Sequence, residues 1–371
     1  MRSTSLTRLL AVLGAGALLA AGVSPSAGAP SGKHEPAAAV PEVVASGLNN
    51  PRGLAFAPDG SLYVAEAGTG GAGPCFAGPE GPSCFGMTGS VTRIGRHGQE
   101  RVLTGLPSIG VEGSGDAGIG PSDVAFRGND KVYVTVGLGA DPAIAEQLPA
   151  LGEMGQLVLA KPSKGTWSTV VDLADFETDN DPNEDGPDTN PNSVLVSQGR
   201  AIVSDAGAND LLRIKQNGSV EVIATFPNVD VPGPGGAPFS MDFVPTTVAK
   251  GPDGALYVGQ LTGFPFPLGG AKVYRIGPSG TEVVAEGFTN IISIAFDGAG
   301  NLYVLEIFHN GLLSGDPTGA LIRVAPNGDQ TIVMSDGLIT PGGLAVRGAN
   351  AYVSNCGTCA GGGEVLRIPL S

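Results

Sequence analysis

The sequence is poor in charged side chains, and in basic ones above all. Only 15% of its 371 residues are charged, and 20 Lys and Arg stand against 35 Asp and Glu, which gives a net charge of −15. Because no cluster of Lys or Arg interrupts this acidic balance, nucleic acids and anionic membranes are excluded as partners. Stretches rich in Ala, Glu, Lys and Leu with a helical period are also missing after the N-terminal segment, so long helices and coiled coils are not expected.

Histidine is scarce as well, which narrows the chemistry available for catalysis. The chain holds three histidines, His34, His97 and His309. The first lies in a segment rich in Ala and Pro and the second in a short turn, so His309 is the one candidate for an imidazole base. A solvated loop histidine is the alternative. Gly-x-Ser-x-Gly motifs, phosphate-binding glycine loops and zinc-type clusters of His and Cys are absent after the N-terminal segment.

Residues 1–29 have the three-part pattern of a secretory signal peptide. Two arginines precede an apolar run over residues 9–23, and small residues follow it. A retained membrane anchor is the alternative, but the run is shorter than the roughly 20 apolar residues that span a bilayer. Residues 30–41 are predicted to form a linker before a single folded domain at 42–371. We therefore expect a secreted or extracytoplasmic protein with no membrane attachment after cleavage.

The four cysteines gain meaning from this location, because oxidising compartments favour disulfides. Cys75 and Cys84 enclose a short loop full of Gly, Pro and Ser, and we predict that they pair. Cys356 and Cys359 form a Cys-x-x-Cys motif, which in redox proteins needs a thiolate at the start of a helix. Here a strand-like segment and a run of glycines flank the motif, which favours a small structural disulfide over a redox site.

What the sequence has in abundance is glycine, proline and an internal repeat. It contains 60 Gly and 30 Pro, and its apolar residues, 42% of the total, are spread along the whole chain. Each repeat begins with an apolar strand and continues with a Gly-containing turn, an apolar-Tyr-Val type strand, a third strand and a fourth. The six repeats begin at Pro51, Pro121, Pro191, Pro245, Ile291 and Pro341. Six four-stranded units with tight turns predict an all-β, six-bladed β-propeller.

The two ends of the chain complete this prediction. The sixth repeat stops after its third strand at residues 364–368, and so lacks a fourth strand. Residues 42–48, which precede the first repeat, closely match the fourth strand at residues 282–288. We therefore expect the N-terminal strand to complete blade six and close the ring, which leaves no open sheet edge there.

The repeats differ in length almost entirely in two kinds of loop. Insertions fall between second and third strands and between consecutive blades, whereas the other turns stay short. In a propeller these two kinds of loop emerge on the same face, and insertions confined to one face build a binding surface. We call it the long-loop face, and we expect it to bind a small molecule, a glycan or a protein.

Polar residues recur where the second strands enter this face. The equivalent positions hold Glu66, Val136, Asp205, Gln260, Glu306 and Asn355. Five of the six carry side-chain oxygens. In a ring near the axial channel they would bind a polar ligand or a hard cation such as Ca²⁺ or another divalent ion. The alternative is that each side chain accepts a hydrogen bond from its own following loop, as Asp and Asn often do.

A second acidic site lies in the loop before the third repeat. Asp181, Asn183, Asp185 and Gly186 follow the 1, 3, 5, 6 spacing of a calcium loop, in which alternate oxygens converge on the ion. Position twelve is Asn192 and not the usual bidentate Glu. The sequence thus gives Asp181, Asn183 and Asp185 as candidate metal ligands, with a solvated acidic loop as the alternative.

Several motifs together resemble the ScyD/ScyE family, over nearly the whole chain from residue 40 to 369. They are Pro74-Cys75 to Cys84, Thr88-Gly89-Ser90-Val91-Thr92-Arg93-Ile94, Asp188-Thr189-Asn190-Pro191, Val203-Ser204-Asp205-Ala206-Gly207-Ala208-Asn209-Asp210 and the closing Gly362-Gly363-Glu364-Val365-Leu366-Arg367-Ile368-Pro369. The resemblance implies a secreted or periplasmic propeller related to NHL-repeat proteins, and it implies no particular reaction.

Two functions are therefore open. The first is ligand or partner binding at the long-loop face, without chemistry. The second is a divalent-metal-dependent hydrolase or lyase of the gluconolactonase-like type, in which Glu66, Asp205 and Glu306 would hold the ion and His309 or a carboxylate would act as base. Since a fold alone does not confer activity, binding is the preferred interpretation.

Overall fold

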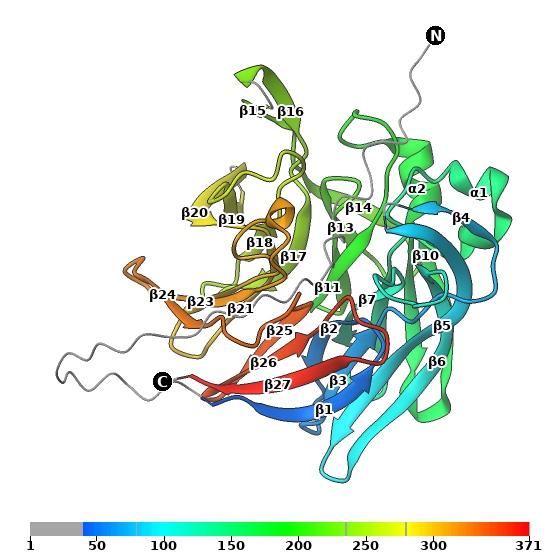
Figure 1. Cartoon of the computed structure of the whole chain (residues 1–371), viewed down its shortest axis with the longest axis horizontal. Helices are drawn as coiled ribbons and strands as arrows, with labels where there is room; N and C mark the ends of the chain where they lie inside the picture. The colour runs from blue at the N-terminus through cyan, green and yellow to red at the C-terminus, as the bar shows by residue number, and fades with distance from the viewer. Residues whose placement is uncertain (1–39, 79, 234–235, 279, 371) are drawn as a thin grey trace, which may run out of the picture.

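The computed structural model describes residues 40–78, 80–233, 236–278 and 280–370. Six four-stranded antiparallel sheets surround a central axis, which confirms the predicted six-bladed β-propeller. In Figure 1 the first strand of each blade lies near the centre of the ring, and the fourth strand lies at its outer edge. The predicted signal peptide, 1–29, and residues 30–39 of the linker lie outside the described residues. No helix among the described residues is long and apolar enough to cross a membrane.

The first three blades follow the chain from the first strand inside to the fourth outside. Blade 1 contains β2 (Pro51–Phe56), β3 (Leu62–Glu66), β5 (Gly81–Gly95) and β6 (Gly98–Val111). Blade 2 contains β7 (Pro121–Phe126), β8 (Val132–Val136), β9 (Gln156–Lys161) and β10 (Thr166–Asp172). Blade 3 contains β11 (Pro191–Ser197), β12 (Arg200–Asp205), β13 (Asp210–Ile214) and β14 (Val220–Thr225).

The other three blades repeat this order, and the last one is closed by the N-terminal strand. Blade 4 contains β17 (Pro245–Lys250), β18 (Leu256–Gln260), β19 (Ala271–Gly277) and β20 (Gly280–Phe288). Blade 5 contains β21 (Ile291–Phe296), β22 (Leu302–Glu306), β23 (Ala320–Val324) and β24 (Gln330–Met334). Blade 6 contains β25 (Gly343–Arg347), β26 (Asn350–Asn355), β27 (Gly363–Pro369) and, as its outer strand, β1 (Glu42–Leu48).

The closure of the ring is as predicted. Strand β1 pairs antiparallel with β27, with Glu42 opposite Arg367 and Leu48 opposite Gly363. The Arg367 guanidinium donates a hydrogen bond to the Glu42 carboxylate across this pair. Figure 1 shows the blue β1 beside the red β27, so the two ends of the propeller domain lie in one sheet. The outer edge of β27 is therefore covered, as the edge of a strand must be if it is not to pair with another chain.

The position of a strand within its blade determines how deeply it is buried. All five residues are buried in β3, β8 and β22, because neighbouring blades cover both faces of each sheet. These second strands are accordingly near-continuous apolar runs, such as Leu62-Tyr63-Val64-Ala65. The outer strands β14, β20 and β24 are mostly exposed. The core thus consists of apolar layers between adjacent blades.

The insertions form additional structure on the long-loop face. Strand β4 (Cys75–Gly78) pairs with the first part of β5, and β15 (Val229–Pro232) with β16 (Pro238–Met241) forms a hairpin that projects from the ring in Figure 1. The short helices are α1 (Ile144–Gln147), α2 (Leu173–Asn180), η1 (Pro149–Glu153) and η4 (Leu312–Ser314), and η2 (Pro162–Lys164) forms a turn between β9 and β10.

Both predicted disulfides are present, Cys75–Cys84 and Cys356–Cys359. Cys75 lies directly opposite Cys84 in the β4–β5 pair, so the first bridge joins the arms of a small hairpin. The second bridge closes the turn between β26 and β27. Each disulfide therefore stabilises an insertion or a turn of the long-loop face rather than a blade.

Candidate functional site

The inner strands of the six blades enclose an axial cavity of about 430 Å³. Its lining comes from the first strands and is mainly apolar and hydroxyl-bearing. One carboxylate, Asp123 on β7, lies in this wall and accepts hydrogen bonds from Ser193 Oγ at 2.9 Å and from the backbone N–H groups of Val124 and Val194. Its enclosure raises the pKa of Asp123 to about 6, against these donors, which lower it.

The predicted ring residues occupy equivalent positions, as the pairing of first and second strands shows. Glu66 lies opposite Pro51, Asp205 opposite Pro191, Gln260 opposite Pro245 and Glu306 opposite Ile291, each at the end of a second strand; Val136 lies opposite Pro121, and Asn355 ends β26. All six side chains are buried. Since the second strands lie one strand outside the cavity wall, none of these residues belongs to its lining.

Four of these side chains accept a hydrogen bond from the backbone of the loop that precedes their own blade. The bonds run from Asn49 N to Glu66 Oε2 (2.7 Å), from Asn190 N to Asp205 Oδ1 (2.6 Å), from Thr289 N to Glu306 Oε1 (2.6 Å) and from Ile339 N to Asn355 Oδ1 (2.7 Å). In Gln260 the Oε1 accepts from the Tyr274 hydroxyl instead. The alternative considered from the sequence, a hydrogen bond from the loop that follows the residue, is present at Asp205, which also accepts from Gly207 N and Ala208 N. The four bonds above come from the preceding loop instead, and ligand binding by the ring stays a prediction.

A bulge recurs beside these positions. In five of the blades the pairing of first and second strands shifts register just after the first strand begins, as between Pro51 and Leu54 or between Ile291 and Ser293. A bulge adds local twist and redirects the side chains beside it. It does not by itself determine the bond to the incoming loop, because Asn355 makes that bond without a register shift between β25 and β26, whereas Gln260 beside a bulge does not.

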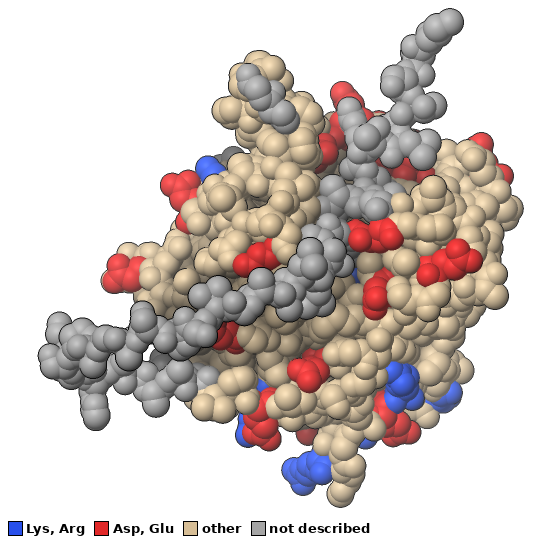
Figure 2. Space-filling model, in the orientation of Figure 1, with Lys and Arg blue, Asp and Glu red and all other residues tan. Residues whose placement is uncertain are grey.

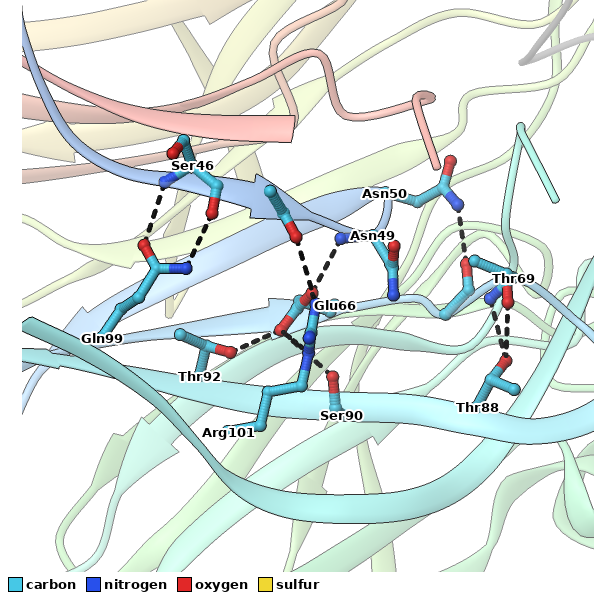
Figure 3. Close-up of polar contacts among 12 residues, drawn as sticks. Ser46, Asn49, Asn50, Glu66, Thr69, Thr88, Ser90, Thr92, Gln99 and Arg101 are labelled. Carbon is cyan, nitrogen blue, oxygen red and sulfur yellow. Dashed lines mark hydrogen bonds and ion pairs between the residues drawn. The ribbon is translucent and has the colours of Figure 1, made fainter. Parts of the chain in front are cut away.

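Glu66 is the most completely bonded of the ring carboxylates (Figure 3). Its Oε1 accepts from Ser90 Oγ at 3.1 Å, from Thr92 Oγ1 and from Arg101 Nε at 3.0 Å, and its Oε2 accepts from Arg101 Nη2 at 2.8 Å and from Asn49 N. The hydrogen bond from Arg101 to this carboxylate raises the pKa of the Arg101 guanidinium. Glu66 therefore has its charge balanced and both oxygens occupied within blade 1.

Glu306 lies beside the candidate base His309. His309 Nδ1 is 2.5 Å from Glu306 Oε2, and the His309 side chain keeps 33% of its surface exposed. Burial raises the pKa of Glu306, and the hydrogen bonds from His309 and Thr289 lower it. His309 therefore contacts Glu306 directly, and its role as an imidazole base stays a prediction.

The predicted acidic loop turns its oxygens inward. Helix α2 ends where Asp181 takes a left-handed conformation, φ 38°, and Asp181 Oδ2 accepts a hydrogen bond from Gly186 N at 3.2 Å. Asp181 Oδ1 and Asn183 Oδ1 are buried and have no hydrogen-bond partner. Asp185, the third predicted ligand, acts electrostatically on two neighbouring carboxyls, Glu177 and Asp188.

Three acids in this region were not singled out from the sequence as ligands. Burial, together with the charges of nearby carboxylates, raises the pKa of Glu177 to about 8 and that of Asp188 to about 8, and raises that of Asp210 well above its usual value. Glu177 precedes Asp181 by one helical turn, a spacing that the sequence does show. Asp210 begins strand β13, and only the fold brings it to the loop.

The long-loop face also carries apolar side chains. Phe239, Phe264, Leu268 and Leu313, which we call the apolar rim, keep 37%, 39%, 70% and 67% of their surface exposed. The rings of Phe239 and Phe264 meet edge to face at 5.1 Å, and Phe264 also contacts the buried Phe266. Two other phenylalanines of the insertions, Phe76 and Phe85, pack against the apolar cluster between blades 1 and 2 instead.

No family model and no curated protein matches this chain. Among solved structures it is similar to a protein of unknown function from Bacteroides thetaiotaomicron, with 11% identity and a TM-score of 0.55 over 89% of this chain and 75% of that one. It is also similar to virginiamycin B lyase from Staphylococcus aureus (14% identity, TM-score 0.50, 90% and 100% covered) and to regucalcin, a calcium-binding protein from Agrobacterium tumefaciens (12%, 0.49, 90% and 94%).

At these identities the likenesses show the fold alone. The chain has a β-propeller architecture like that of virginiamycin B lyase. Ligand, substrate and metal must be argued from its own residues.

Proposed function

We propose that this protein is a secreted β-propeller of the ScyD/ScyE type that binds a small molecule, a glycan or a protein through its long-loop face. The observation that carries the proposal is the apolar rim, because its side chains come from three separate insertions and remain exposed. Phe239 belongs to β16, Phe264 and Leu268 to the loop between β18 and β19, and Leu313 to η4. Exposed apolar side chains gathered on one face are typical of binding surfaces.

The geometry of the rim suits a ligand with an apolar or ring-shaped surface. Phe264 is held between Phe239 and the buried Phe266, so its ring is presented in a fixed orientation. Aromatic rings that are already ordered lose little conformational entropy on binding. On the face drawn in Figure 2 the acidic side chains are scattered, whereas the basic ones lie mainly toward the lower edge, near the β5–β6 hairpin. A polyanionic partner is therefore disfavoured.

The test compares capture by two matched variants. Phe264→Ser with Leu268→Ser removes two rim side chains, and Val283→Ser with Ile332→Ser removes two exposed apolar side chains from the outer strands β20 and β24. The exported protein is immobilised and challenged with a glycan array, a small-molecule library and the proteins of the culture medium. We expect capture by the wild type and by the outer-strand variant, with loss in the rim variant. Equal capture by both variants would contradict the proposal.

A second candidate function rests on the contact between Glu306 and His309. Here we propose a divalent-metal-dependent hydrolase or lyase of the gluconolactonase-like type, with His309 as the base held by Glu306. The saturated hydrogen bonding of Glu66 speaks against that residue as a metal ligand. The test is turnover of lactones and other ring-opening substrates with added Ca²⁺ or Mg²⁺, where His309→Ala should abolish any activity that the wild type has. For either function we propose a divalent cation, Ca²⁺ first, as cofactor.

A further inference from the structure

Two buried carboxylates have side-chain oxygens without a hydrogen-bond partner. They lie in the described part of blade 3 and of the connection that leads into it. Glu177 on α2 is 1% exposed and its Oε1 is unpaired, and Asp210 on β13 is 0% exposed with both oxygens unpaired. Buried polar groups in folded proteins are almost always hydrogen-bonded, and buried charges are paired or bind metals. Two such carboxylates that act on each other, from different elements, therefore indicate a site for a cationic ligand.

Three further side-chain oxygens in the same region are buried and have no hydrogen-bond partner. They are Asp181 Oδ1, Asn183 Oδ1 and Asp188 Oδ1. The charges of Asp181 and Asp188 act on Glu177, so these three carboxyl groups lie in the same region. A Cβ on Gly207 would lie 2.6 Å from Asp188 Oδ1, so this oxygen rests against the turn that leads from β12 to β13 and hence to Asp210.

Protonation alone does not satisfy these groups. A neutral carboxylic acid still carries one O–H that needs an acceptor, and neither oxygen of Asp210 has a neighbour in hydrogen-bonding position. The charged side chains that act on Glu177, Asp188 and Asp210 are all carboxylates. By contrast Asp205, which is equally buried in the same blade, accepts four hydrogen bonds, from Thr189, Asn190, Gly207 and Ala208.

We infer that Glu177, Asp181, Asn183, Asp188 and Asp210 form a divalent-cation site of the calcium class. All five supply hard oxygen ligands, four of them carboxylates, and Ca²⁺ takes about 6–8 oxygens at about 2.3–2.6 Å. In any three of the four acids, at least one pair of ligand oxygens is more than 4.8 Å apart. Oxygens on opposite sides of a calcium ion are about 4.6–5.2 Å apart, so the acids must come closer together to bind one ion. Binding therefore draws the loop after α2 toward β13.

The site has a defined place in the molecule. It joins the connection between blades 2 and 3 to the third strand of blade 3, and so fixes one segment of the long-loop face. The inference gives ligands for the divalent cation that we proposed above as cofactor. It rests on that proposed cation and not on the proposed binding by the apolar rim. The site and the apolar rim share no residue, so loss of ligand capture in the rim variant and loss of cation binding in the site variants are separate results.

The experiment is calcium titration by calorimetry on the full mature protein after treatment with a chelator, together with thermal denaturation with and without millimolar Ca²⁺. The site variants are Asp210→Asn and Glu177→Gln. One control is Asp179→Asn, which removes the same charge from an exposed position of α2. The other is Glu66→Gln with Glu306→Gln in the ring.

For the wild type we expect one binding event and a calcium-dependent rise in Tm. In each site variant we expect the affinity to fall by more than about tenfold, because ligand charge sets the affinity of calcium sites. Asp179→Asn should bind as the wild type does. If the wild type gives no heat of binding at millimolar Ca²⁺, the inference is overturned, whatever the variants show. Heat that persists in both site variants but is lost in the ring variant also overturns it, and moves the cation to the ring.

Discussion

Glu66 in blade 1 and Asp210 in blade 3 are both carboxylates with no exposed surface, yet their surroundings are opposite. Glu66 receives hydrogen bonds from Ser90, Thr92, Asn49 and the Arg101 guanidinium, so its charge is balanced in place. Asp210 has neither a donor nor a cation, and the neighbouring acids Asp205 and Glu177 raise its pKa further. Burial alone therefore does not distinguish a structural carboxylate from one that is placed to bind a ligand, whereas its donors do.

The strongest test of this comparison is the same chemical change at both positions, beginning with Glu66→Gln. The amide is similar in size but brings two N–H donors to a place already crowded with donors, and it leaves Arg101 without its partner carboxylate. We expect a loss of about 3 kcal/mol in the free energy of unfolding, since breaking a buried ion pair costs about 3–5 kcal/mol and Arg101 is partly exposed. Urea denaturation measures it. A loss below about 1 kcal/mol would show that the donors of Glu66 are replaceable.

Asp123 is the intermediate case, with three donors but no cation. Its pKa is raised to about 6 in the folded state, so between about pH 4 and pH 6 the native protein binds more protons than the unfolded chain. The free energy of unfolding therefore falls as the pH rises through this window, by about 2–3 kcal/mol at about 1.36 kcal/mol per pKa unit, and its contribution is constant above it.

Asp123→Asn keeps an acceptor for the backbone donors and removes the titration. The measurement is urea denaturation of wild type and variant at several pH values between 4 and 7. The difference in the free energy of unfolding between the two proteins reports on Asp123 alone. Glu177, Asp188 and Asp210 also have raised pKa values, which lower the free energy of unfolding at higher pH in both proteins. Parallel curves for the two proteins would show that the carboxyl of Asp123 is not destabilised by its place in the cavity wall.

The sequence contains enough information for the blades because each blade is a local repeat. Strand, turn and second strand recur, and the match between residues 42–48 and 282–288 predicts the closure that the pairing of β1 with β27 shows. Strand β4, the β15–β16 hairpin and α2 occur once each, so no repeat pattern indicates them.

The same distinction applies to the candidate site. The ring positions were predicted correctly as equivalent, but four of their side chains bond the loop before their own blade, a contact that the strand pattern does not show. The spacing of Asp181, Asn183 and Asp185 indicates a calcium loop. Asp210 is separated from that loop by a whole hairpin, and its role depends on a long-range contact. Local spacing can thus identify part of a ligand set, and only the fold completes it.

The smallest expected effect has the opposite sign to the first. With a chelator present, Asp210→Asn removes a buried, unpaired carboxyl that is surrounded by acids, and we expect the free energy of unfolding to rise by about 1–2 kcal/mol. Asp179→Asn on the exposed side of α2 should change it by less than about 0.5 kcal/mol. Saturating Ca²⁺ should reverse the ranking, because the wild type then gains binding free energy that the substituted amide cannot supply. A variant that is less stable than the wild type in the chelator would mean that the Asp210 carboxylate is already satisfied, and that Glu66 and Asp210 differ less than their hydrogen bonds indicate.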